Sequence, residues 1–293
     1  MQLKQTVFCM KRFLLGLGFA SLWASASVVN KFGLEGNQPP LWMTNLRFMI
    51  AAFLLLLIVH GIQRAAFPKG NEWKSLLIYG VLNNTLYMSL FIYGLKGASA
   101  GISTLTLAIN PVLISILSSI FLKKEISKNT WIGLFLGTLG IIVATFPLLR
   151  NAYISLEGML FLGASMLCYS IGTVYYTSQT WTLPKLSINA WQIFFGAICM
   201  LPITFLFNEI STTVYTTQFC LSVLWLVIIV TIIAVQFWLN LLSIDAVKAS
   251  FWLFTCPIFG FIYANIFVGE PITIFTIAGT ILVISGLYIH QKT

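Results

Sequence analysis

Long apolar segments separated by short polar stretches follow one another along the whole chain. Each segment has about 18 to 25 residues, enough for a helix rising 1.5 Å per residue to cross a hydrocarbon core of about 30 Å. The segments are apolar on all sides, whereas a membrane β-strand would alternate over about ten residues. The pattern therefore predicts an all-α polytopic membrane protein with ten transmembrane helices. The predicted spans are residues 13–31, 41–60, 74–96, 99–122, 131–149, 157–178, 188–207, 219–243, 249–268 and 272–290.

The composition supports lipid as the solvent of this chain. Of its 293 residues, 59% are hydrophobic and 8% are charged, whereas a soluble protein carries about 25% charged residues. This excludes a soluble globular protein, a disordered chain and a disulfide-stapled secreted module. The net charge of +9 comes from cations dispersed between apolar runs, so it does not indicate a nucleic-acid partner.

The cations instead indicate the orientation of the chain in the membrane. Of the 16 Lys and Arg residues, twelve lie on the side of the predicted bundle that holds the N-terminus, and only Lys31, Lys96 and Arg150 lie on the other. Because basic residues are enriched in cytoplasmic loops, both termini are expected in the cytoplasm. The first span also resembles a cleavable signal peptide. We expect it to be retained, because the second half contains a matching span and cleavage would break that correspondence.

That counterpart belongs to an internal repeat. A shift of 146 residues places the two halves in register without gaps, and predicts one five-helix unit in residues 1–150 and another in residues 151–293. Because five crossings are odd, the second unit must enter the membrane inverted, as in many alternating-access transporters. Matched positions include Trp23 with Tyr169, Ser27 with Thr173, Pro111 with Pro257, Gly133 with Gly279 and Gly140 with Gly286.

Short motifs occur in matching order in the two halves. The first half has Leu22-Trp23-Ala24-Ser25 with Lys31, then Arg47-Phe48, Asn110-Pro111, Lys124-Glu125 and glycines 133, 137 and 140; the second has Pro257, Gly269-Glu270 and glycines 279 and 286. Over almost its full length the chain thereby resembles the drug/metabolite transporter superfamily, in particular its bacterial EamA-type ten-helix members. One departure is that Ile193 stands where Arg47 would map in the second half.

The resemblance implies a secondary transporter in the bacterial inner membrane. Its expected cargo is a small metabolite, with amino acids and related compounds as the best guess, and export is expected rather than uptake. No cofactor is implied. The expected partners are the solute and the lipid bilayer, while the choice between monomer and homodimer stays open.

Polar and aromatic residues inside the spans are the candidates for a solute cavity. Trp23 and Tyr169, related by the repeat, are expected to face each other. Such a lining would suit a neutral, zwitterionic or amphipathic metabolite, although the polar groups could also be interhelical hydrogen bonds of the packed bundle. The candidates are Trp23, Ser27, Arg47, Asn83, Asn84, Tyr87, Asn110, Tyr169, Thr173, Gln236, Trp238 and Asn240.

Three of the predicted features have two readings each. Arg47, the full charge inside a span, either snorkels to the interface or binds a substrate carboxylate or phosphate. Pro111 and Pro257, near the centres of the fourth and ninth spans, either kink their helices for packing or serve as hinges. The spacing of Gly133 and Gly137 predicts close helix packing within a half, or dimerisation.

Two unlike functions are the alternatives to a carrier. An integral membrane enzyme would need a nucleophile with its base, paired carboxylates or a metal cluster, and the sequence has no persuasive spacing of this kind or of metal ligands. A channel would need a filter loop or a ring of charges. All seven acids lie in loops or at helix ends, so any proton coupling is expected to be indirect or peripheral.

Overall fold

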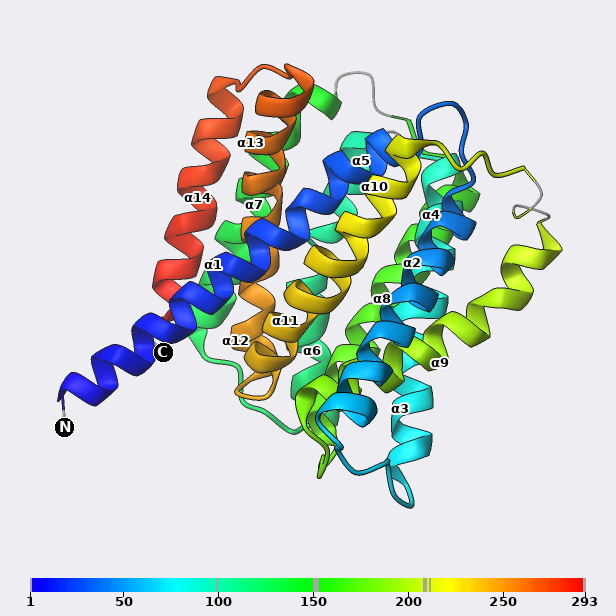
Figure 1. The fold of residues 1–293 in the computed structure, drawn as a ribbon. Coiled ribbons are helices and arrows are strands. Elements are labelled where there is room, and N and C mark those ends of the chain that lie inside the picture. Colours follow the sequence, from blue (N-terminus) through cyan, green and yellow to red (C-terminus); the bar gives the residue numbers. More distant parts are fainter. Residues whose placement is uncertain (1, 99, 150–152, 208–209, 211, 292–293) are drawn as a thin grey trace.

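The protein is an almost entirely helical bundle (Figure 1). The computed structural model describes residues 2–98, 100–149, 153–207, 210 and 212–291. Within these residues, nine helical stretches are long and apolar enough to cross a membrane, and Ile274–His290 forms a shorter apolar helix. These ten segments match the ten predicted spans, which confirms the polytopic all-α fold. The boundary predicted between the two units, at residue 150, lies outside the described residues.

The elements of the two halves correspond along the chain. Three segments, η1, η2 and η3, are π-helical, and η4 is a 3₁₀ helix. The first half contains α1 (Gln2–Gly33), α2 (Pro40–Leu56), η1 (Leu57–Ile62), α3 (Glu72–Gly80), η2 (Val81–Leu86), α4 (Tyr87–Lys96), α5 (Ala100–Leu107), α6 (Asn110–Phe121) and α7 (Lys128–Leu149). The second half contains α8 (Leu156–Ser178), α9 (Lys185–Leu206), α10 (Thr217–Trp225), η3 (Leu226–Ala234), α11 (Val235–Leu242), α12 (Ala246–Ser250), η4 (Phe251–Thr255), α13 (Cys256–Val268) and α14 (Ile274–Gln291).

The fourth and ninth spans are interrupted just before their prolines. Pro111 lies in the first turn of α6 and Pro257 in the first turn of α13. Each proline still lies inside one span, Thr104–Phe121 or Ala246–Val268, but the helix changes just before it, through a turn at residues 108–109 and through η4 respectively. Proline lacks a backbone N–H, and the first turn of a helix is where that donor would have no partner anyway.

The last helices of the two halves, α7 and α14, pack against each other through their backbones. An ideal Cβ built on Gly279 would lie 2.3 Å from the carbonyl oxygen of Gly140, and one on Gly133 would lie 2.8 Å from that of Gly286. The close packing predicted for the first-half glycines thus occurs between the halves, not within one. A spacing of small residues identifies a helix face that permits close approach, but it does not identify the helix that meets it.

The bundle has two distinguishable ends. The linkers at residues 63–71, 122–127, 179–184 and 243–245 lie at one end, toward which both termini also point (Figure 1). This end is called the basic end because it holds Lys124, Lys185 and Lys248. The linkers at residues 34–39 and 269–273 lie at the opposite end.

The glycine contact leads to a prediction about stability. We expect Gly279→Ala to lower the free energy of unfolding by about 1–3 kcal/mol, because the new methyl group would overpack the contact with α7. Gly163→Ala in α8 is the matched control, since its Cβ would meet nothing within 4 Å and should stabilise the helix slightly. Thermal unfolding of the purified variants in detergent checks this, and equal midpoints for the two variants would contradict it.

Candidate functional site

Five aromatic side chains form a continuous cluster at the centre of the bundle. They are Phe19 and Trp23 on α1, Tyr87 on α4, Tyr169 on α8 and Trp238 on α11. Phe19 stacks on Trp238 with ring centroids 4.8 Å apart, and it lies 5.7 Å from the ring of Trp23. Tyr169 lies 6.3 Å from Trp238 and 4.9 Å from Tyr87. The aromatic cluster therefore joins helices from both halves.

This arrangement differs from the predicted pairing of Trp23 with Tyr169. The two rings are linked through Phe19 and Trp238 rather than directly. Phe19, which is fully buried, was not among the predicted residues, because one phenylalanine among 24 carries no signal of its own. Its position one helical turn before Trp23 is the signal that could have found it.

Arg47 is buried in α2, with 3% of its surface exposed. Its guanidinium carbon lies 4.7 Å from the centre of the Phe48 ring, and Trp23 of the aromatic cluster packs against the group of buried side chains to which Phe48 belongs. Among the described residues no ion pair or hydrogen bond to Arg47 is found, and its Nε is buried without a partner. A snorkelling arginine would expose its head group, so the low exposed fraction of Arg47 favours the reading as a binding residue.

Several other candidates also present buried polar atoms without a partner. An unsatisfied buried donor or acceptor costs about 1–3 kcal/mol, so a group of them indicates a place where water or a solute supplies the missing hydrogen bonds. In the described part of the chain these atoms include Asn83 Oδ1, the Tyr169 hydroxyl, Thr173 Oγ1, Gln236 Oε1 and Trp238 Nε1.

Asn84 and Asn110, by contrast, are tied into the packing of the bundle. Asn84 donates to the side-chain oxygen of Gln192 on α9 at 3.0 Å, and Gln192 donates to Asn189 at 3.2 Å. Asn110 accepts a hydrogen bond of 3.1 Å from Ser170 of α8. These contacts match the alternative reading as interhelical hydrogen bonds.

Ser27 and Asn240 were also predicted to line the solute cavity, but each makes a hydrogen bond within the protein. Ser27 donates to the carbonyl oxygen of Ala24 in its own helix, at 2.8 Å. Asn240 accepts a 2.9 Å hydrogen bond from Lys185 Nζ, which places it near the basic end rather than at mid-membrane. This depth agrees with the position of Asn240 three residues before the end of the predicted span 219–243.

A cavity of about 440 Å³ opens at the basic end. Its walls come from α6, α8, α9, α11 and the linkers between helices, and they include Lys124, Lys185 and Asp245. Tyr176 and Trp181, stacked with ring centroids 5.6 Å apart, form an aromatic part of the wall. With two lysines against one aspartate, these three charged groups carry a net positive charge, which favours a solute with a negative group.

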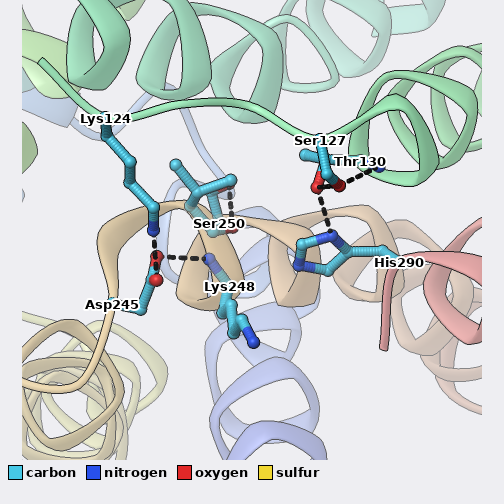
Figure 2. Close-up of polar contacts among 8 residues, drawn as sticks. Lys124, Ser127, Thr130, Asp245, Lys248, Ser250 and His290 are labelled. Carbon is cyan, nitrogen blue, oxygen red and sulfur yellow. Dashed lines mark hydrogen bonds and ion pairs between the residues drawn. The ribbon is translucent and has the colours of Figure 1, made fainter. Parts of the chain in front are cut away.

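The linker between α6 and α7 and the first turn of α7 are both fastened to the second half (Figure 2). Lys124 forms an ion pair with Asp245, and Thr130 Oγ1 lies 3.1 Å from Nδ1 of His290. Asp245 also caps α12 by accepting a 3.0 Å hydrogen bond from the backbone N–H of Lys248. These two contacts tether residues 124–130 to the second half.

The ion pair controls the pKa of Asp245. Burial alone would raise this pKa, but the hydrogen bonds from Lys124 and from the Lys248 backbone, together with the charge of Lys124, outweigh burial. The pKa of Asp245 is therefore lowered from its ordinary value of 3.8. Stability from this group is present above that ordinary value and is lost as the pH falls through the lowered pKa.

This gives a pH-dependent prediction. We expect Asp245→Asn to lower the free energy of unfolding at pH 7 by about 1 kcal/mol, the upper value for an exposed ion pair. Asparagine keeps the helix cap, so the loss reports the charge. The difference from wild type should begin to shrink as the pH falls below about 4, and it should vanish once the pH is below the lowered pKa of the aspartate, which is then neutral in the folded protein as well. Thermal unfolding between pH 3 and pH 7 measures it, and a constant difference would refute it.

Comparison with known proteins places this geometry in a family. The model of the EamA-like transporter family matches residues 10–146 and, a second time, residues 156–290. The chain belongs to the EamA-like transporter family. The two matches cover most of the chain, one in each half, so this EamA-like protein is a multi-pass membrane transporter by family.

Full-length relatives carry transporter names. The chain is 26% identical to the uncharacterized transporter YoaV of Bacillus subtilis, over 97% of this chain and 98% of that protein. It is 24% identical to a probable amino-acid metabolite efflux pump of Salmonella typhimurium, over 94% and 93% respectively. A solved crystal structure covers 97% of both chains with a TM-score of 0.81 at 17% identity, which shows a shared fold.

The described residues contain no group of three or more His, Cys, Asp or Glu side chains that could hold a metal ion. The chemistry offered by the site is thus that of buried cations, amides and aromatic rings. Such groups recognise a solute by charge, hydrogen bonding and stacking.

Proposed function

We propose that this EamA-like protein is a secondary transporter that exports a small carboxylate-bearing metabolite, an amino acid or a related compound, by alternating access. The observation that carries the proposal is Arg47, a positive charge buried near the aromatic cluster, with no acid among the described residues to neutralise it. A buried charge without a partner is strongly destabilising, so its retention calls for an anionic group that arrives with the solute.

The guanidinium group is suited to this task. Its planar fork can bind both oxygens of a carboxylate, and it is more weakly hydrated than a lysine ammonium. The neighbouring rings would hold the apolar body of the solute, and the unpartnered atoms of Asn83, Thr173 and Gln236 would complete its hydrogen bonds. In this proposal Ser27, Asn84, Asn110 and Asn240 support the helices around the site.

The route into the site begins at the basic-end cavity. We place this end in the cytoplasm of a bacterial cell, with both termini there, because most of the cations lie on that side of the chain. A net positive cavity would collect a carboxylate from the cytoplasm and deliver it toward Arg47. The printed name of the Salmonella relative, a probable amino-acid metabolite efflux pump, agrees with this cargo and direction.

The cycle would use the two units, residues 1–150 and 151–293, as inverted repeats that exchange conformations. Pro111 and Pro257 begin α6 and α13 directly after a turn and a 3₁₀ segment. These junctions lack a continuous α-helical hydrogen-bond ladder, so they are the proposed flexing points.

A ligand screen tests the role of Arg47. We expect some amino acids or other small carboxylates to raise the thermal midpoint of the purified protein, because a ligand of the folded state stabilises it. The matching amides, which lack the negative charge, should not. Arg47→Gln should weaken binding by about 10- to 100-fold, the loss of a charge-assisted hydrogen bond, and Arg47→Lys should weaken it less.

Arg64→Gln is the matched control, because Arg64 is exposed in a linker and should bind like wild type. Counterflow of a hit in proteoliposomes then separates a carrier from a channel, since only a carrier shows saturable exchange. Unchanged binding by Arg47→Gln would refute the role of Arg47, and flux without saturation would refute the carrier.

A further inference from the structure

The repeat allows the two ends of the bundle to be compared position by position. At the opposite end, Gln218 at the start of α10 donates a 2.7 Å hydrogen bond to Glu35 in the linker after α1. The shift of 146 residues places Gln218 on Glu72 and Glu35 on Trp181. At the basic end, Glu72 accepts a 2.8 Å hydrogen bond from Thr182, the neighbour of Trp181. A hydrogen bond between the start of a helix and a linker of the other half therefore occurs at both ends.

One contact does not follow the repeat. Lys31, at the end of α1, and Glu270, in the linker after α13, form an ion pair of 3.5 Å at the opposite end. The same shift places Thr177 on Lys31 and Lys124 on Glu270. At the basic end, however, Thr177 and Lys124 both line the open cavity.

The partners of these two residues show what replaces the contact. Thr177 donates to the carbonyl oxygen of Val174 in its own helix, at 2.9 Å. Lys124 pairs with Asp245, which the shift relates to residue 99, outside the described residues. The end of α8 and the linker after α6 are thus each held elsewhere, whereas their counterparts at the opposite end are tied together.

We propose that the Lys31–Glu270 ion pair is the outer gate of the transport cycle, and that the structure is the inward-open state. The inference rests on the alternating-access function proposed above. In the outward-open state the two halves exchange conformations. Lys31 and Glu270 then separate, while Thr177 and Lys124 approach each other and close the basic-end cavity.

The gate is weak, which suits a state that must open on every cycle. Both side chains are more than half exposed, at 59% and 54%, and an exposed ion pair contributes little to stability. Breaking it is therefore expected to move the equilibrium toward the outward-open state by about two- to five-fold rather than to lock the protein.

The test measures how accessible the cavity is and needs no solute. Thr177→Cys, in inside-out membrane vesicles of the full chain, is labelled with a membrane-impermeant maleimide, and the labelling rate is read at that peptide by mass spectrometry. Adding Glu270→Gln or Lys31→Gln should lower this rate, by up to about five-fold, because the fraction of the protein with an open cavity falls. The double variant Lys31→Glu/Glu270→Lys, in which the two charges are exchanged, should restore the wild-type labelling rate.

Gln218→Ala is the matched control. It removes a contact of the kind found at both ends, so the labelling rate should not change. The proposal is overturned if Glu270→Gln leaves the rate unchanged or raises it, if the charge exchange does not restore it, or if Gln218→Ala lowers it equally. Labelling of residue 177 only from the other face of the membrane would overturn both the gate and the orientation.

These results are independent of the proposed cargo. A gate response in a protein to which no carboxylate binds would refute the cargo and keep the gate. Binding that depends on Arg47, together with an unchanged labelling rate in Glu270→Gln, would keep the cargo and refute the gate.

Discussion

The structure is organised around a positive charge that the fold buries without neutralising. Arg47 is buried inside a bundle that spans the membrane, and no acidic side chain among the described residues pairs with it. An isolated guanidinium in a membrane is costly. The Phe48 ring lies against the guanidinium group, and elsewhere among the described residues several buried polar atoms also lack a partner. A bundle built only for stability would have had an apolar residue here, as the second half has with Ile193.

Much of the architecture could be predicted because lipid imposes a simple rule on the sequence. A helix must be apolar over the thickness of the hydrocarbon core, so all ten spans were visible, and two copies of one pattern revealed the repeat. Details that depend on backbone geometry were not visible. The π-helical η2 and η3 fall on related positions in the two halves. Because a π turn changes the angle between residues four apart, helical spacing in the sequence does not show which face of the third span Asn83 shares.

The candidate site was predictable where a residue type is rare in its surroundings. A lone arginine within a span stands out, and so do the amides. The sequence could not show which amides meet a partner, since that depends on the helix opposite. Asn84 finds Gln192 while Asn83 leaves its oxygen unpaired, although the two are adjacent. Phe19 was missed for the opposite reason, since it is a common residue in an apolar helix and its importance comes only from the ring of Trp238 against it.

The backbone contact between α7 and α14, made at Gly133, Gly140, Gly279 and Gly286, has a mechanical consequence. Where main-chain atoms of two helices touch with no side chains between them, there are few rotamers to rearrange, so the distance between the two axes is fixed at that contact. Such a junction acts as a pivot. If the remaining helices of each half swing about it, an opening at one rim of the bundle requires a closing at the other, and the membrane is never breached by a continuous water column.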